Sequence, residues 1–386
     1  MNLTNLRIFV TTSHISTVYM TLLAESTKNE NNIDILLVDT GTRRAEKIEH
    51  MRLTAALYSW RIFHNFSQVA PEIHDLNPNW RKRMTRRLKT LAVFKPVYKL
   101  LLDRFMNKMD AKYRGELTTL LSPYLSDAGN VELFLMTGTY LNSPLKQLFP
   151  DAKLNYMEHG VGDYHQILKE GKPIGEMYAV FAAPFRDFLA KQGMTTSWVH
   201  DLSGLDRFST VAKQLLEAPV LKMNDAGTNG KKIIFILMEA VDMYEVPASF
   251  WSAYLDKIFA QLKNPADYHF LLKPHHLQSA VSIRLTREHL DKLGYAYTLL
   301  DDERIKSSAL EVLFVHWAEK VEQVFFLFSS AGFYLSALYP GYGIRFRYSV
   351  DFLTPYVKNA PLQYQEFYRD IIPIIENVLN KNCEKY

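Results

Sequence analysis

The chain has 386 residues, 48% of them hydrophobic and 22% charged, so it can bury a sizeable core as two domains or one large one. Its net charge of +4 is too small to indicate a nucleic-acid-binding protein by itself. The single cysteine, Cys383, excludes a disulfide framework within one chain and is typical of a reducing compartment.

Targeting signals are not evident in the sequence. No apolar run approaches the roughly 18 residues that indicate a membrane-spanning helix, and residues 1–12 lack the basic and apolar pattern of a signal peptide. We therefore expect a cytoplasmic protein, or one that is peripheral on the inner face of the cytoplasmic membrane.

The chain begins with an alternation of apolar runs and helical patterns. Strands are predicted at 6–10 and 33–38, with a helix at 16–25 between them. This order is typical of a doubly wound α/β domain. His14 follows the first strand and is a candidate for the wall of a cleft, although a loop histidine without a role is equally consistent with the sequence.

Residues 79–114 form a basic segment with twelve Lys or Arg residues and two acidic residues, Asp103 and Asp110. Apolar side chains recur in it at three-to-four spacing, and Pro96 is expected to divide it into two helices. A basic amphipathic helix is typical of a membrane surface, where anionic lipid attracts each nearby cation by about 1 kcal/mol. A solvated basic face packed on the protein core would give the same pattern, so both interpretations stay open.

Two further strands, predicted at 131–136 and 153–157, end in polar motifs. The first precedes Thr137-Gly138-Thr139-Tyr140, and the second precedes Glu158-His159-Gly160-Val161-Gly162-Asp163-Tyr164. The glycines at 160 and 162 let the backbone turn tightly and let a ligand approach. A third glycine is missing and no helix is predicted here, so the motif is not a dinucleotide-binding fingerprint. A strand at 177–182 and a helix at 184–191 complete this part.

A polar, turn-rich segment at 218–231 is predicted to link a first domain, 1–217, to a second, 232–360. The second domain has its own α/β series. Strands are predicted at 233–238, 268–272 and 321–328, an edge strand at 344–348, and helices at 247–262 and 279–293. The last segment, 361–386, begins with a helix that is expected to pack back on the first domain.

The strand at 321–328 leads into Ser329-Ser330-Ala331-Gly332 and a predicted helix. Open α/β sheets bind ligands at the carboxyl ends of their strands. A helix that starts there aims backbone N–H groups and the positive end of its dipole at an anion. The stretch therefore predicts a phosphate site, although a capped turn with no ligand has the same appearance.

Polar residues at three strand ends could act together in one group-transfer reaction. Glu158 could take a proton from an attacking hydroxyl, and His275 with the Ser329 and Ser330 hydroxyls could stabilise a leaving phosphate. A capping carboxylate and structural histidines are the plainer alternatives. His275 and His276 are adjacent on an extended chain and point opposite ways, which disfavours a shared metal ion. No Asp-x-Asp pair is present to hold a divalent ion, so a metal-independent site is favoured.

The order of these motifs resembles that of the bacterial sialyltransferases, particularly the capsule polysialyltransferase family, over residues 133–336. In the first half, the family's Thr-Gly-x-Tyr motif and its acidic pair with Gly-x-Gly-x-Tyr are matched by Thr137, Gly138, Tyr140, Glu158, Gly160, Gly162 and Tyr164. In the second half, its Lys-x-His-Pro motif and its Ser pair after an apolar strand are matched by Lys273, His275, Ser329 and Ser330.

Two positions depart from the family pattern. His159 stands at the second acidic position, so Glu158 would act as base alone. His276 stands where the family has proline, which leaves open which histidine faces the phosphate and which sugar the donor carries.

The resemblance implies a GT-B fold, in which two Rossmann-like α/β domains face each other across a cleft. It also implies an inverting transfer from CMP-activated sialic acid without a metal ion or another cofactor. The implied catalytic residues are Glu158 and His275. The implied donor-phosphate or nucleotide-binding residues are Ser329, Ser330, His276, Lys273 and Gly332. The implied acceptor or cleft residues are Gly138, Tyr140, His159, Gly160, Gly162, Tyr164 and His14.

The implied partners are the CMP-activated nonulosonic acid and a glycan acceptor in capsule or lipooligosaccharide synthesis. The basic segment 79–114 would serve a polyanionic acceptor, the inner membrane surface or capsule assembly proteins, and no nucleic acid is expected. Transfer from CMP-Kdo, from CDP-glycerol or from CMP-linked legionaminic or pseudaminic acid is an alternative. A non-catalytic protein that binds polyanions or glycans is another, and it would leave CMP-sugars intact.

Overall fold

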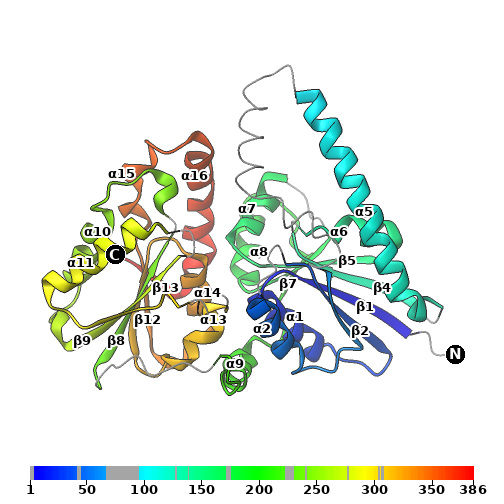
Figure 1. Ribbon diagram of the computed structural model, residues 1–386, viewed down its shortest axis with the longest axis horizontal. Coiled ribbons are helices and arrows are strands. Elements are labelled where there is room, and N and C mark those ends of the chain that lie inside the picture. Colours follow the sequence, from blue (N-terminus) through cyan, green and yellow to red (C-terminus); the bar gives the residue numbers. More distant parts are fainter. Residues whose placement is uncertain are drawn as a thin grey trace. The chain divides into compact units, whose positions relative to one another are not determined.

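The computed structural model describes residues 4–40, 45–66, 95–126, 128–137, 139–170, 175–221, 230–239, 241–275, 278–302, 305 and 308–386. These residues form two parallel α/β sheets of seven and six strands with helices packed on them (Figure 1). Contacts divide the chain into two compact units, Met1–His159 with Pro173–Tyr178, and Gly160–Lys172 with Ala179–Tyr386. The two parallel sheets confirm the predicted α/β class.

The seven-stranded sheet has the order β3-β2-β1-β4-β5-β6-β7. Its strands are β1 (Thr4–Thr11), β2 (Asn32–Val38), β3 (Ile62–Asn65), β4 (Ala128–Leu135), β5 (Lys153–Met157), β6 (Glu176–Ala179) and β7 (Val199–Asp201). The helices of the first unit are α1 (His14–Ser26), α2 (Ala45–Ala55), α5 (Lys95–Leu125) and α6 (Asn142–Leu148). The strands predicted at 6–10, 33–38, 131–136 and 153–157 are confirmed to within a few residues at their ends.

One face of this sheet is covered by α5 and α6. Leu6, Ile8 and Val10 of β1 point to that face because successive strand residues alternate between the two sides. The buried residues of α5 recur every four positions on one side of the helix: Met109, Tyr113, Leu117 and Leu121. This supports the interpretation that the last residues of the basic segment belong to a helix packed on the protein core. Pro96 lies in the first turn of α5, and residues 79–94 lie outside the described part of the chain.

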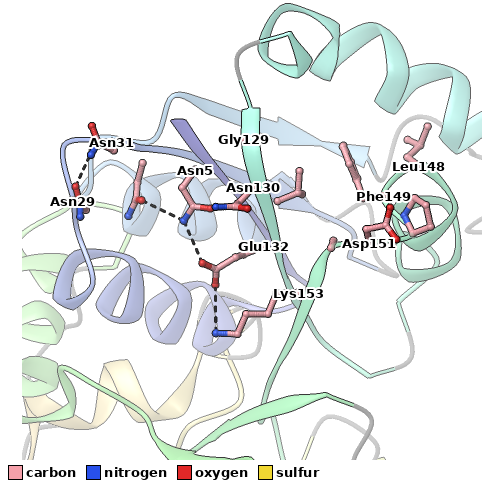
Figure 2. Close-up of a pocket in the computed structure, with 14 residues that line it drawn as sticks. Asn5, Asn29, Asn31, Gly129, Asn130, Glu132, Leu148, Phe149, Asp151 and Lys153 are labelled. Atoms are coloured by element: carbon pink, nitrogen blue, oxygen red, sulfur yellow. Dashed lines mark hydrogen bonds and ion pairs between the residues drawn. The ribbon is translucent and has the colours of Figure 1, made fainter. Parts of the chain in front are cut away.

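A depression of about 800 Å³ lies at the amino ends of β1, β4 and β5 (Figure 2). Asparagine is its most frequent polar lining residue, at Asn5, Asn29, Asn31, Asn32 and Asn130. Asn29 accepts the N–H of Asn31 at 3.1 Å, as turn residues commonly do, and Asn5 donates to Glu132 at 3.2 Å. These contacts belong to the turn and the sheet, and none of the predicted site residues lines this depression.

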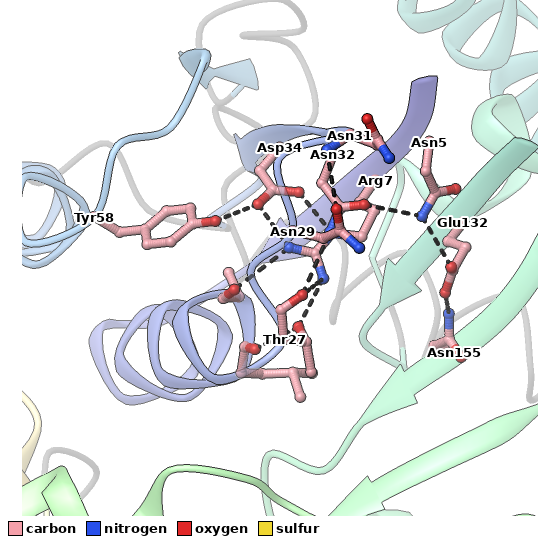
Figure 3. Close-up of polar contacts among 12 residues, drawn as sticks. Asn5, Arg7, Thr27, Asn29, Asn31, Asn32, Asp34, Tyr58, Glu132 and Asn155 are labelled. Atoms are coloured by element: carbon pink, nitrogen blue, oxygen red, sulfur yellow. Dashed lines mark hydrogen bonds and ion pairs between the residues drawn. The ribbon is translucent and has the colours of Figure 1, made fainter. Parts of the chain in front are cut away.

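Beside this edge, a buried ion pair joins the first two strands (Figure 3). Arg7 of β1 and Asp34 of β2 are register partners, and the guanidinium donates to both carboxylate oxygens at 2.6 Å. The remaining donors of Arg7 reach Thr27 and Ala24 at the end of α1, so the buried charge is well satisfied. The Tyr58 hydroxyl also donates to Asp34. Burial is the larger cause, and this hydrogen bond the second, of the raised pKa of Tyr58.

The six-stranded sheet has the order β10-β9-β8-β11-β12-β13. Its strands are β8 (Lys232–Met238), β9 (Tyr268–Pro274), β10 (Tyr297–Leu299), β11 (Val321–Phe326), β12 (Arg345–Tyr348) and β13 (Cys383–Lys385). The α-helices of the second unit are α7 (Val161–Glu170), α8 (Ala182–Lys191), α9 (Phe208–Leu216), α10 (Phe250–Phe259), α11 (Ala280–Leu293), α13 (Leu310–Leu313), α14 (Ser330–Leu338), α15 (Thr354–Val357) and α16 (Leu362–Asn377). Its short 3-10 helices are η3 (Leu205–Arg207), η4 (Val241–Tyr244), η5 (Pro265–Asp267), η6 (Phe314–His316), η7 (Pro340–Tyr342), η8 (Val350–Phe352) and η9 (Leu379–Asn382).

Three element predictions for this unit were wrong. A helix, α7, does begin at Val161, where none was predicted. The strand β11 ends at Phe326, two residues before its predicted end. The strand predicted at the sheet edge, β12, is an interior strand, because the short β13 at the end of the chain pairs with it.

The division by contacts differs from the predicted domain boundaries. It places α7, α8 and α9 with the second sheet, whereas the predicted first domain extended to 217. The terminal helix α16 contacts α7 and α8, which that prediction had assigned to the first domain. Within the predicted linker, residues 222–229 lie outside the described residues. Across the described ranges, no helix combines the length and apolar character needed to cross a bilayer.

Candidate active site

A pocket of about 300 Å³ in the second unit collects predicted residues from three separate stretches. Five of them line it: Gly160, Gly162, His275, Ser329 and Ser330. The other described lining residues are Val161, Glu239, Tyr244, Phe328, Phe367 and Ile371. The pocket lies beyond the carboxyl ends of β8, β9 and β11, where parallel sheets present ligand sites.

His275 is the first residue after β9, and its backbone is fixed by the neighbouring strand. Its N–H donates to the carbonyl of Met238, the last residue of β8, at 2.7 Å. His275 is among the residues that line the pocket, and His276 lies outside the described residues. Lys273 is not among the lining residues, and its ammonium donates to the Pro274 carbonyl at 2.9 Å.

Ser329 and Ser330 mark the start of α14. Ser329 is the N-cap residue and Ser330 is the first helical residue. The N–H groups in the first turn of a helix have no acceptor within the helix, and the helix dipole favours negative charge at that end. The two hydroxyls and these N–H groups can together bind a phosphate.

Glu239 is a pocket residue that the sequence analysis missed. It follows β8, is 6% exposed, and accepts the N–H groups of Leu327, Phe328 and Ser329 at 2.9, 3.1 and 2.8 Å. Burial raises the pKa of this carboxyl to about 8, and the three backbone bonds oppose that shift. The only signal in the sequence was an acidic residue at the end of a predicted strand.

Tyr244, at the end of η4, is the second pocket residue that the sequence analysis missed. It is 1% exposed, and its buried hydroxyl has no hydrogen-bond partner among the residues described. Its ring lies edge-to-face with Phe328, next to the serine pair. A ligand in the pocket is a natural partner for this hydroxyl, because an unpaired buried hydroxyl is costly.

The glycine motif after β5 forms the beginning of α7. Gly160 and Gly162 line the pocket, and a Cβ added at either position would meet no atom within 4 Å. Tyr164 of the same motif is fully buried, with its ring edge-to-face against Phe185. The motif therefore contributes its glycines to the pocket and its tyrosine to the core.

Glu158 and His159 directly precede these glycines in the chain but belong to the first unit. Glu158 is 1% exposed, and its N–H donates to the Tyr178 carbonyl at 3.0 Å, which extends the pairing of β5 with β6. His159 is exposed. The chain thus places the predicted base two residues before the pocket residue Gly160.

The other predicted acceptor or cleft residues lie in the first unit. Tyr140 is half-buried, and its N–H donates to the carboxylate of Asp39 at 2.9 Å. Gly138 lies outside the described residues. His14 was a candidate for a cleft wall, but the structure buries it at 2% exposure with Nε2 2.9 Å from the Thr54 hydroxyl. Burial lowers the pKa of His14 to about 3, so it stays neutral at physiological pH.

Gly332 was a predicted donor-site residue, but the structure gives it a packing role. It is buried in α14 and is not among the pocket-lining residues. A Cβ on it would lie 2.5 Å from Cγ of Phe326, so only glycine lets α14 approach β11 this closely.

In the described ranges, no three His, Cys, Asp or Glu side chains are grouped as metal ligands would be. None of the pocket's described lining residues is Lys or Arg.

Comparisons with known proteins give the family and the fold of the chain. A family model described as alpha-2,8-polysialyltransferase (POLYST) matches residues 7–328. A UDP-GlcNAc 2-epimerase from Methanocaldococcus jannaschii has a TM-score of 0.51 at 11% identity, over 98% of this chain and 93% of that chain. A further UDP-N-acetylglucosamine 2-epimerase has a TM-score of 0.50 at 13% identity, over 90% of this chain and 78% of that chain. These structures share the GT-B type of fold with this chain, and the likeness concerns the fold alone. No curated protein sequence matched.

Proposed function

Because this chain belongs to the alpha-2,8-polysialyltransferase family and is therefore a glycosyltransferase, we propose how it transfers sialic acid. The donor is CMP-sialic acid or a related CMP-linked nonulosonic acid, and the acceptor is a glycan of capsule or lipooligosaccharide synthesis. The observation that carries the proposal is the single pocket that joins His275, Ser329 and Ser330 with the glycines of the Glu158 motif.

The donor phosphate binds at the start of α14. The Ser329 and Ser330 hydroxyls and the free N–H groups of the first helical turn surround it. As the bond between the anomeric carbon and the phosphate oxygen breaks, negative charge grows on CMP. His275 stabilises that charge or protonates the departing phosphate.

Glu158 acts as the base. It takes the proton of the acceptor hydroxyl while that oxygen attacks the anomeric carbon from the side opposite CMP, so the configuration inverts. Glu158 is 1% exposed, and the proposal requires its carboxylate to become accessible to the acceptor hydroxyl. The reaction needs no metal ion, because N–H groups, hydroxyls and an imidazole meet the phosphate charge.

The test measures CMP release and chain extension with an oligosialic acid acceptor in the presence of EDTA. Removing a general base or a charge-stabilising group typically costs 10²- to 10⁴-fold in rate. We expect losses of about that size for Glu158→Ala and His275→Ala, and a smaller loss for the Ser329→Ala and Ser330→Ala pair.

His289→Ala is the matched control. His289 lies on α11 and pairs with Asp256 at 2.7 Å outside the pocket, and an exposed pair of this kind contributes about 1 kcal/mol or less. Its rate should stay within about twofold of the wild type. A near-normal rate for Glu158→Ala would remove Glu158 as base, and loss of transfer in EDTA would refute metal independence.

A further inference from the structure

The carboxyl group of Glu239 occupies a place in the pocket that resembles an oxyanion site. Its Oε1 atom receives three consecutive N–H groups, those of Leu327, Phe328 and Ser329, and Oε2 lies 3.2 Å from the Leu327 nitrogen. Consecutive backbone N–H groups that converge on one point are how turns bind anions. Here the acceptor is a carboxyl oxygen that the protein supplies from the end of a neighbouring strand.

These bonds fix the turn between β11 and α14. The strand ends at Phe326 and the helix begins at Ser330, so the three N–H groups lie in neither element. Each would cost about 1–3 kcal/mol if it were buried without an acceptor. Glu239 therefore determines the path of the turn and, with it, the direction in which Ser329 and Ser330 face the pocket.

A phosphate in this pocket would share it with Glu239. Like charges at short range favour protonation of one partner, and no Lys or Arg stands among the described lining residues to offset the repulsion. In the described part of the chain, the titratable groups around Glu239 include the His275 imidazole, which lines the same pocket, and the hydroxyls of Tyr244, Tyr254 and Tyr386, which interact with its charge. Burial already raises the pKa of the Glu239 carboxyl to about 8, so a proton is available near neutral pH.

We propose that Glu239 is a positioning residue of the donor site, which holds the turn at 327–329 and takes up a proton when the donor phosphate binds. This inference rests on the proposed function, because the phosphate in question is that of the CMP donor. In this step an O–H bond forms on the Glu239 carboxyl and the corresponding bond in a solvent water or buffer acid breaks, and no other covalent bond changes.

The experiment is a calorimetric titration of the full chain with CMP at pH 8.5, in two buffers that differ in ionisation enthalpy. With a pKa of about 8, roughly three quarters of Glu239 is ionised at this pH, so wild-type protein should take up as much as about 0.75 proton per CMP. The affinity for CMP should fall about tenfold between pH 7 and pH 9.

Glu239→Gln is the informative variant because it is almost isosteric. Its amide oxygen can accept the same three N–H groups, while its side chain no longer titrates. CMP should bind to it with an affinity that changes less over this pH range, and with less proton uptake. Any proton taken up by the CMP phosphate or by His275 persists in the variant, so the difference from wild type isolates Glu239.

Glu322→Gln is the matched control, since Glu322 stands at the opposite end of β11 and pairs with Lys232 at 2.8 Å. It should behave as the wild type does. Equal proton uptake by wild type and Glu239→Gln would overturn the inference and leave the proposed function intact. Absence of CMP binding to the wild type would overturn both.

Discussion

Gly332→Ala tests how closely α14 and the turn at 327–329 are held to the second sheet. A Cβ at this position would lie 2.5, 2.6 and 2.7 Å from three ring atoms of Phe326, whereas ordinary contacts are 3.4 Å or longer. Phe326 is fully buried and its ring packs edge-to-face on Phe333, so the ring has little room to move. Either the ring or the helix must shift by roughly 1 Å.

Overpacking of this kind costs about 1–3 kcal/mol, and the better helix propensity of alanine returns at most about 1 kcal/mol. We therefore expect Gly332→Ala to lower the free energy of unfolding by about 1–2 kcal/mol. Urea unfolding, monitored by tryptophan fluorescence, measures this change. If the dependence of the unfolding free energy on urea concentration has the same slope in both proteins, their unfolded states are comparable.

Two comparisons make the measurement decisive. Gly341→Ala is the control, because its added Cβ meets nothing within 4 Å and its effect should stay within about 0.5 kcal/mol. Phe326→Leu removes ring atoms from the clash, so Gly332→Ala should cost less in that background. A Gly332→Ala protein as stable as the wild type would show that α14 and Phe326 accommodate the added Cβ without strain.

Two further predictions concern buried charges. Asp34→Asn removes the counter-charge of Arg7, which is 3% exposed, and should lower the free energy of unfolding by about 3–5 kcal/mol. A loss in the free energy of unfolding no larger than that of Tyr58→Phe, about 1–2 kcal/mol, would contradict this. The folded-state pKa of Glu239, about 8, lies above its ordinary value of 4.5, so its contribution to stability is fully present below pH 4.5 and is lost as the pH rises to 8. Relative to Glu239→Gln, the free energy of unfolding of the wild type should therefore fall by about 1.4 kcal/mol per pH unit between pH 4.5 and 8. If the unfolding free energies of the two proteins change with pH in parallel, this prediction is wrong.

The sequence predicted the main strands because each is a continuous apolar run bounded by turn residues. Some of the predicted site residues lie together in the pocket, since the carboxyl ends of parallel strands share one sheet edge, but Lys273 and Gly332 do not line it. His275, Ser329 and Ser330 follow β9 and β11, and this rule alone brings them together.

The misses have local physical causes. The strands β7, β10 and β13 have three residues each, too few to show a period. The helix α7 begins between two glycines, residues with low helix propensity, so its start was not visible. His14 looked like a loop residue, but the capping box of Ser13 and Ser16 starts α1 at this point and the histidine is buried.

The role of Glu239 could not be read from sequence because it depends on strand order. Its partners lie 88 to 90 residues away, and they come close only because β11 pairs with β8 in the sheet. Arg7 and Asp34 likewise meet through the register of β1 and β2. Sequence patterns report each strand separately and leave the neighbours of a strand unassigned.

The most direct test of the account is CMP release by the wild-type chain from a panel of activated donors, with oligosialic acid as acceptor and EDTA present. We expect CMP-sialic acid or a related CMP-nonulosonic acid to be consumed and the acceptor to grow by the corresponding sugar. Consumption of only CMP-Kdo or CDP-glycerol, or of no donor at all, would contradict it.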